Sequence, residues 1–402
     1  MHKYFFLFFF FFSVQNVFCQ APKEFNSSQI FEQIKKLDVL GSVLYVAAHP
    51  DDENTRLLAY LANGKLYRTG YLSMTRGDGG QNLIGNEQGV ELGLIRTQEL
   101  LAARRIDGAE QFFTRAYDFG FTNSPVETFQ FWNHDKILSD VVWVIRKFQP
   151  DVIITRFPTT GEGGHGHHTA SAILAGEAFE AAADPTKFPE QFKYGVKPWQ
   201  AKRLLWNTFN FGSVNTERPD QFKIDAGGYN ALLGKSYGEI AAESRSQHKT
   251  QGFGVPSSRG ISYEYFKTIK GSAPVKTLMD GVTTDWQRLN DQSMEKDIQK
   301  LINDYSFQNP QNSLPALLQI YKSLKKSPEG YWRDQKLKEV KQIMKECIGL
   351  YIETTTKTMF AVQGDSLQVN FVADNRLGGN VTITSVTIQN IKFPLNDELP
   401  AA

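Results

Sequence analysis

The stretch from Val43 to Glu53, VLYVAAHPDDE, decides the fold. Its first six residues, Val43–Ala48, form a continuous apolar run, which is typical of a strand buried on both faces of a parallel sheet. His49, Asp51 and Asp52 follow this run directly. In open α/β sheets, ligand sites gather at the carboxyl ends of the strands. We therefore expect an α/β fold with a functional site at residues 49–52.

Short apolar runs continue to alternate with amphipathic segments as far as about residue 250. This alternation predicts βα units around a mostly parallel sheet flanked by helices. In one predicted helix we expect Leu94, Leu100, Leu101 and Ile106 to share a side. The predicted strands are Val43–Ala48, Gly70–Thr75, Val152–Thr155 and Leu204–Phe209, and the predicted helices are Asn54–Ala62, Leu94–Ile106, Asp140–Phe148, His168–Ala182 and Tyr237–His248.

The composition divides the chain into four segments. Residues 1–19 have a basic start and an aromatic run, the pattern of a cleaved secretory signal peptide. Residues 38–255 form the predicted α/β domain. Residues 256–355, rich in Lys, Gln and Leu, predict a mostly helical extension. Residues 356–402 alternate apolar with polar side chains and predict the start of a β-rich, sandwich-like region, with a hairpin turn at Asn375–Asn380.

The signal pattern predicts a secreted or periplasmic protein. Its apolar run is shorter than the about 20 residues that span a bilayer, so we expect no transmembrane segment after cleavage. A lipid anchor on Cys19 is the alternative, which the bulky Phe18 disfavours. After cleavage Cys347 alone remains, so we expect neither an internal disulfide nor a cysteine metal ligand.

The overall composition is that of an ordinary globular protein. The 402 residues are 41% hydrophobic and 22% charged, with a formal net charge of +1. This balance gives no indication of nucleic acid or an anionic membrane surface as a partner. A neutral or weakly charged substrate fits it better.

A second polar cluster lies far downstream, in the segment Gly161–Thr169, GEGGHGHHT. It holds three of the seven histidines of the chain and follows a predicted strand. One of these histidines, together with His49 and Asp52, would give three ligands and an open position for water, which is the arrangement of catalytic zinc sites. The glycines would let the backbone approach a ligand closely. The sequence therefore predicts a metal-dependent hydrolase.

Four motifs in this order carry a resemblance to a known family: AHPDDE, RTQE, YDFG and a strand leading to HxxH. Together they resemble the PIG-L/LmbE family of zinc-dependent N-deacetylases over roughly residues 40–255. The resemblance implies a Rossmann-like α/β domain at residues 38–255, one Zn²⁺ per chain, and an N-acetylated amino sugar or glycoconjugate as substrate. A site of two histidines and an aspartate also accepts iron or cobalt.

Carried over by position, the resemblance implies His49, Asp52 and His168 as zinc ligands. It implies Asp51 as the general base. His165 matches the histidine that stabilises the oxyanion and assists the leaving amine. These roles describe metal-assisted hydrolysis of a linear amide.

The remaining motifs supply the predicted substrate contacts. Asp78 in TRGDGG, Arg96 in RTQE and Asp118 in YDFG fall where members of the family contact the sugar. Each has a plainer explanation as a turn residue, an ion-pair partner or a loop cap. His248 and Gln251, in HKTQ, resemble a late family motif and are expected to support the structure near the site.

One departure from the family pattern concerns the position between the two histidines. The family commonly has an aspartate there, as HxDH, whereas this chain has His167. His167 is also an alternative ligand to His168, although the spacing favours His168. Two other functions stay open: an amidase acting on another acylated amine, and a glycan-binding protein with a vestigial metal site.

Overall fold

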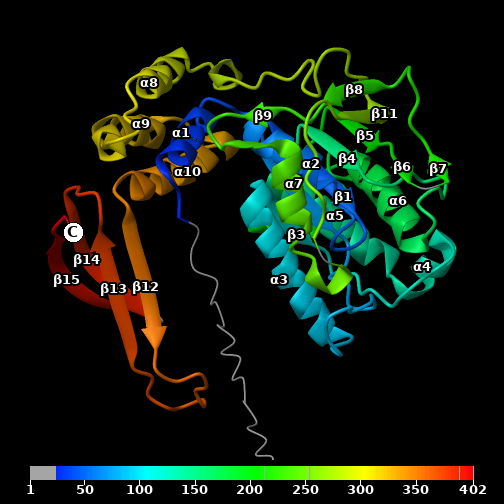
Figure 1. Cartoon of the computed structure of the whole chain (residues 1–402), viewed down its shortest axis with the longest axis horizontal. Coiled ribbons are helices and arrows are strands. Elements are labelled where there is room, and N and C mark those ends of the chain that lie inside the picture. Colours follow the sequence, from blue (N-terminus) through cyan, green and yellow to red (C-terminus); the bar gives the residue numbers. More distant parts are fainter. Residues whose placement is uncertain (1–23, 212, 253, 389, 402) are drawn as a thin grey trace, which may run out of the picture.

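The computed structural model describes residues 24–211, 213–252, 254–388 and 390–401. The predicted signal peptide lies outside the described residues. Figure 1 shows an α/β body around a central sheet, a group of helices (α1, α8, α9 and α10) to one side of it, and long C-terminal strands beyond these helices. The predicted α/β fold with a β-rich C-terminal region is confirmed.

The central sheet has the strand order β3-β2-β1-β4-β5-β11-β8. Its first five strands are parallel, whereas β11 is antiparallel to both of its neighbours. The strand order reverses between β1 and β4, and such a switch point opens a crevice at the carboxyl ends of the two strands. The strands are β1 (Ser42–Ala47), β2 (Arg68–Ser73), β3 (Glu110–Phe113), β4 (Val152–Thr155), β5 (Arg203–Asn207), β8 (Phe222–Asp225) and β11 (Tyr263–Gly271).

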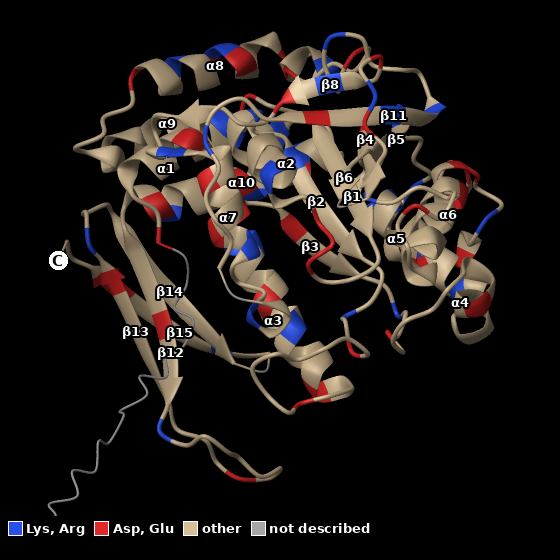
Figure 2. Ribbon diagram, turned by 45° about the vertical axis from the view of Figure 1, so that its right-hand side comes forward, with Lys and Arg blue, Asp and Glu red and all other residues tan. Residues whose placement is uncertain are grey.

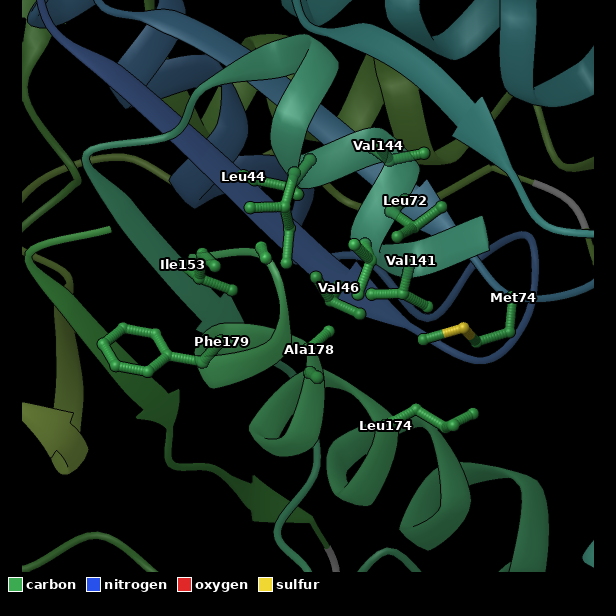
Figure 3. Close-up of a cluster of buried hydrophobic side chains, with 14 of the residues drawn as sticks. Leu44, Val46, Leu72, Met74, Val141, Val144, Ile153, Leu174, Ala178 and Phe179 are labelled. Carbon is green, nitrogen blue, oxygen red and sulfur yellow. The ribbon is translucent and has the colours of Figure 1, made fainter. Parts of the chain in front are cut away.

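Helices cover both faces of this sheet, which explains why the parallel strands are apolar throughout. Alternate residues of β1 point to opposite faces: Leu44 and Val46 join one core and Val43 and Tyr45 the other. Figure 3 shows the first core, where side chains of the sheet meet those of two helices. The first face carries α5 (His134–Phe148) and α6 (Gly166–Ala181), and the second carries α2 (Thr55–Ala59) and α3 (Val90–Asp107), with α7 (Tyr237–Arg245) packed on both of these.

Two local predictions differ from the structure. Helix α2 is short and passes into a π-helical turn at Tyr60–Gly64, so the predicted helix Asn54–Ala62 is not regular α-helix. In α3, Leu100 is fully buried but Leu94 is 62% exposed. The expectation that Leu94 and Leu100 share a side of the helix was wrong, because six positions along an α-helix correspond to about 240° of rotation.

The sheet also extends beyond residue 255, where a mostly helical extension was predicted. Strand β11 pairs with β5 and β8, and its residues alternate between buried and exposed. The helical part of the extension is α8 (Gln292–Asn303), α9 (Leu314–Lys326) and α10 (Tyr331–Cys347). These helices enclose a separate core with α1 (Ser27–Lys36), to which Trp286, Ile298 and Leu317 contribute. Cys347, a free thiol, is buried there.

The C-terminal strands form two separate pairs, β12–β13 and β14–β15. The hairpin predicted at Asn375–Asn380 was wrong, because this turn joins β13 to β14, which do not pair with each other. The first pair is β12 (Leu350–Thr356) and β13 (Val369–Asn375), and the second is β14 (Val381–Ile388) and β15 (Ile391–Leu399).

The remaining elements are short. Charges of both signs are interspersed along helices such as α3 and α8, as Figure 2 shows. Within the described ranges, none of the helices is both long and apolar enough to cross a bilayer. The short elements are α4 (Pro125–Phe131), β6 (Asn210–Phe211), β7 (Val214–Asn215), β9 (Tyr229–Asn230), β10 (Lys235–Ser236) and the 3₁₀ turns Pro189–Tyr194, Lys249–Gln251, Trp286–Leu289 and Pro310–Ser313.

Candidate metal centre

The two polar clusters predicted from the sequence meet at the switch point of the sheet. His49 follows β1, and the histidine-rich loop follows β4, its direct neighbour. The ring centroid of His49 lies 5.1 Å from that of His165 and 5.2 Å from those of His167 and His168. Segments more than a hundred residues apart thus form one group because β1 and β4 are adjacent parallel strands.

The predicted ligand set of His49, Asp52 and His168 is brought together. One potential ligand atom from each lies within 4.8 Å of the others. Asp52 Oδ2 is 3.1 Å from His49 Nδ1, and Asp52 Oδ1 is 3.4 Å from His168 Nε2. Burial alone would raise the pKa of Asp52, but the two histidines lower it well below its usual value. Asp52 is therefore an ionised carboxylate between two imidazoles.

Two contacts hold the ring of His168 in place. Its Nδ1 lies 2.9 Å from the carbonyl oxygen of Gly163, and Phe157 stacks on it with ring centroids 3.7 Å apart and an interplanar angle of 5°. A hydrogen bond of Nδ1–H to that carbonyl would leave Nε2 as the free electron pair that faces Asp52. The glycine at position 163 is required here, because an added Cβ would lie 2.9 Å from the Phe157 ring.

His167 belongs to a second possible ligand set, with His49 and His165. Its Nδ1 lies 3.0 Å from His49 Nε2, and its ring stacks on Trp132 with centroids 4.6 Å apart. The side chain is fully buried, and burial lowers its pKa to about 2. Its Nε2 has no hydrogen-bond partner in the described part of the chain. This second set contains no carboxylate.

His165 is the N-cap of α6. Its Nδ1 accepts a hydrogen bond of 3.0 Å from the backbone N–H of His167. Burial lowers the pKa of His165 to about 4, so the ring is neutral near pH 7. A neutral imidazole that accepts at Nδ1 carries its proton on Nε2. His165 therefore has an N–H free to donate to another group.

Asp51 has an unusual backbone conformation with a φ of 89°. A non-glycine residue in this region carries strain of about 1–3 kcal/mol, which its surroundings must hold. Its N–H donates to Glu53 Oε2 at 2.9 Å, and its carbonyl oxygen accepts from Arg245. Its carboxylate accepts from Arg96 Nη2 at 3.2 Å. Burial raises the pKa of Asp51 above its usual value.

The three predicted substrate contacts lie close to this group. Arg96 is buried and also donates to the carbonyl oxygens of Pro50, at 2.6 Å, and Gly77, at 3.2 Å. Asp118 Oδ1 lies 3.8 Å from His167 Nδ1, and Asp78 packs against α3 at Gly93. Among the described residues, none of these three lines the cavity over the site. Their contact with a substrate stays a prediction.

A buried ion network beneath Asp51 contains residues to which the sequence analysis gave no role in the site. Glu53 Oε1 accepts from Arg104 Nη2 at 3.0 Å and lies 2.9 Å from His248 Nε2. Burial alone would raise the pKa of Glu53, but His248 and Arg104 hold it below its usual value. The HKTQ motif indicated the support role of His248, whereas no local signal links Arg104 or Arg245 to the site.

A cavity of about 820 Å³ opens over the group. Asp51, Asp52 and His168 lie in its lining. The lining further includes Arg56, Arg156, Arg245, Phe157, Phe209, Phe211, Glu162, Glu217, Tyr263 and Glu264. A ligand in this cavity would therefore reach both the carboxylate of Asp51 and the open side of His168.

Two known proteins are similar in sequence to part of this chain. The chain is 31% identical over 183 residues to a 1D-myo-inositol 2-acetamido-2-deoxy-alpha-D-glucopyranoside deacetylase of Geodermatophilus obscurus, covering 41% of this chain and 60% of the relative. It is 30% identical over 200 residues to the mycothiol S-conjugate amidase of Streptomyces coelicolor, covering 46% and 66%. The chain thus spans less than two thirds of the length of either relative.

A solved structure and a family description also match. The N,N'-diacetylchitobiose deacetylase of Pyrococcus horikoshii superposes with a TM-score of 0.43 at 17% identity, covering 58% of this chain and 84% of that one. Residues 44–179 match the family model PIG-L, described as GlcNAc-PI de-N-acetylase. This match contains His49, Asp51, Asp52 and the histidine-rich loop. The resemblance predicted from the motifs is confirmed over residues 44–179.

Proposed function

We propose that the protein is a zinc-dependent N-deacetylase that hydrolyses the acetamide of N-acetylglucosamine-type sugars or glycoconjugates. The observation that carries this proposal is the position of Asp51, beside the group of His49, Asp52 and His168 and in the wall of the same cavity. The match of residues 44–179 to the PIG-L family supports it, as do relatives named as a deacetylase and an amidase.

The donor set fits zinc, which takes imidazole nitrogens and carboxylate oxygens. Two ligand atoms that each lie about 2.1 Å from a tetrahedral zinc ion are about 3.4 Å apart. Asp52 Oδ1 and His168 Nε2 are separated by 3.4 Å. We prefer His168 to His167 as the third ligand, because His168 lines the cavity and His167 is fully buried. Bound zinc would polarise the acetamide carbonyl and lower the pKa of a bound water to about 7.

In this proposal the protein residues position the reacting groups and move the proton. Asp51 takes the proton of the attacking water. Its backbone is held by the hydrogen bonds with Glu53 and Arg245, and its carboxylate is held by Arg96. His165 donates from Nε2 to the oxyanion that develops on the acetamide oxygen. Acetate and a free amino sugar are the products. We also propose that the protein is exported, from the apolar run in residues 1–19.

Acetate release from N-acetylglucosamine and chitooligosaccharides tests the function. The assay compares metal-free protein, zinc-restored protein and the zinc-restored variants Asp51→Asn and Asp135→Asn. Asp135 is the matched control, since its side chain is 88% exposed. We expect zinc-dependent release that Asp51→Asn reduces by at least about 100-fold and Asp135→Asn leaves unchanged.

Each other outcome excludes part of the proposal. Equal release by Asp51→Asn and wild type would exclude Asp51 as the base. Tight zinc binding without acetate release would exclude the N-acetyl sugar and leave an amidase for another acyl group. Failure to bind zinc together with failure to release acetate would overturn the enzyme and favour a glycan-binding protein.

A further inference from the structure

The cavity over the metal-ligand group is larger than an acetamide needs. Its volume of about 820 Å³ falls in the range of about 300–1,000 Å³ that holds a whole drug-sized ligand. Arg156 and Phe211 line this cavity together with Asp51, Asp52 and His168. The substrate therefore has room for groups beyond the sugar ring that carries the acetamide.

Arg156 lies next, along the chain, to a residue that contacts the metal-ligand group. It follows β4 directly, and its N–H donates to the carbonyl oxygen of Val46 at 3.0 Å, which continues the ladder between β4 and β1. The next residue, Phe157, stacks on His168. One extended residue spans about 3.3–3.6 Å. The backbone of Arg156 is therefore only one residue away from Phe157, the ring that contacts the proposed ligand His168.

Two aromatic rings hold the guanidinium of Arg156. It lies 4.7 Å from the ring centroid of Phe211 and 5.5 Å from that of Phe209, and these two rings stack on each other with centroids 4.8 Å apart. Its Nη1 donates a long hydrogen bond of 3.4 Å to Asn207 Oδ1. Stacking restricts the position of the positive charge without neutralising it.

The three arginines of the cavity differ in their charge partners. Arg56 lies 3.5 Å from Glu264, and Arg245 lies 3.9 Å from Asp51. Arg156 has no carboxylate within 4.0 Å in the ranges that the structure describes. Glu264, the ion-pair partner of Arg56, interacts with Arg156 over a longer distance: burial raises the pKa of Glu264, and both arginines act to lower it. Glu162 and Glu217 line the same cavity. Its planar fork of N–H donors matches the oxygens of a carboxylate or a phosphate.

We propose that Arg156, on its platform of Phe209 and Phe211, is a subsite for an anionic group of the substrate. The substrate is then an N-acetylated amino sugar that carries a carboxylate or a phosphate. This inference rests on the proposed deacetylase function and narrows its substrate class. The net charge of the whole chain suggested a neutral substrate, but recognition depends on the local charge in the cavity.

The test compares three substrates of zinc-loaded, full-length protein: N-acetylglucosamine, its 6-phosphate, and N-acetylmuramic acid, which carries a carboxylate. The variants are Arg156→Gln, which removes the charge, and Arg156→Lys, which keeps the charge without the planar fork. Arg115→Gln is the matched control, since Arg115 is 59% exposed and pairs with Asp140. Acetate release gives kcat/KM, and calorimetry with each sugar gives the affinity without requiring turnover.

We expect wild-type protein to prefer at least one anionic sugar by about 10- to 100-fold, the range of a lost charge-assisted hydrogen bond. Arg156→Gln should abolish this preference while kcat/KM for N-acetylglucosamine changes less than about threefold. Arg156→Lys should retain part of it, and Arg115→Gln all of it. A preference for the phosphate or for the carboxylate identifies the source of the charge.

The result that overturns the subsite is a wild-type protein without an anion preference, or an equal effect of Arg156→Gln on all three sugars. Failure of the deacetylase function gives a different pattern, in which none of the sugars releases acetate. In that case the calorimetric comparison still decides: loss of anionic-sugar binding in Arg156→Gln supports the subsite, and unchanged or undetectable binding overturns it.

Discussion

Glu53 Oε1 lies 2.9 Å from His248 Nε2, although 195 positions separate the two residues in the chain. The other oxygen of Glu53 accepts the N–H of Asp51, whose φ of 89° requires support. His248 is 3% exposed, so the contact is buried. The proposed base is thus connected through one carboxylate to His248, in the segment that follows α7.

This connection predicts the effect of replacing His248. In His248→Ala, Glu53 loses a partner, and the support of the Asp51 backbone weakens. We expect kcat to fall by about 10- to 100-fold, as for other groups that orient a metal site from outside, while zinc affinity changes less. Initial-rate kinetics and zinc titration measure the two effects separately.

The control for this variant is His134→Gln, because His134 lies outside the site and pairs with Asp135 and Glu177 at the surface. Equal kcat values for His248→Ala and His134→Gln would show that the network does not support Asp51. A loss of zinc affinity as large as the loss of kcat would assign His248 to the metal group instead.

The choice between His167 and His168 gives a second prediction. His168 Nε2 lies 3.4 Å from Asp52 Oδ1, whereas His167 Nδ1 faces His49 Nε2 at 3.0 Å. We expect His168→Ala to weaken zinc binding by more than about 100-fold and His167→Ala by about 10- to 100-fold, since His167 acts through His49. Zinc titration of both variants measures this difference, and the reverse order would make His167 the ligand.

The sequence predicts the part of this site that depends on local order along the chain. Val43–Ala48 and Val152–Thr155 are apolar runs followed by histidines, and adjacency of two parallel strands brings these histidines together. The side chains that contact Asp51 could not be predicted in this way. Arg96 and Arg245 belong to helices α3 and α7, and their contacts depend on how those helices pack on the sheet. A single sequence contains no local signal for such packing.

In the fold, too, the features set by local sequence could be predicted, whereas those set by long-range packing could not. The alternation of Tyr263–Gly271 is a strand signal, but the Lys- and Gln-rich residues after it suggested a helical extension. The residues Asn375–Asn380 have the composition of a hairpin turn, yet β13 pairs with β12 and not with β14. The partner of a strand depends on packing against its neighbours, which the composition of a turn does not show. Helix α1, near the N-terminal end of the described residues, packs into the core formed by α8, α9 and α10. The periodicity of a helix shows which of its faces is apolar, but not which distant helices pack against that face.

Helix α3 offers a matched pair of leucines for a stability test. Leu100 is fully buried in the core under the sheet, and Leu94 is 62% exposed. We expect Leu100→Ala to lower the free energy of unfolding by about 2–5 kcal/mol, because a cavity remains among packed side chains. Leu94→Ala should change it by less than about 0.5 kcal/mol. Urea unfolding measures both, and similar losses would contradict the packing described for α3.

The loop before α8 gives a prediction about pH. The carboxylate of Asp280 accepts from the N–H groups of Val275 at 2.7 Å, Lys276 at 2.6 Å and Thr277 at 3.1 Å. These hydrogen bonds lower the pKa of Asp280 below its ordinary value of about 3.9. Between the two pKa values the unfolded chain binds more protons than the folded chain, so this stabilisation is present above about pH 4 and is lost as the pH falls.

Asp280→Asn removes the charge and with it this dependence on pH. We expect wild-type protein to have a higher Tm than Asp280→Asn near pH 7, and the difference to shrink as the pH falls from about 5 to about 2. Asp297→Asn, on the exposed side of α8, removes one charge without these hydrogen bonds and serves as the control. Thermal unfolding at each pH measures the difference, and a gap between wild type and Asp280→Asn that stays constant at low pH would contradict the role assigned to the carboxylate.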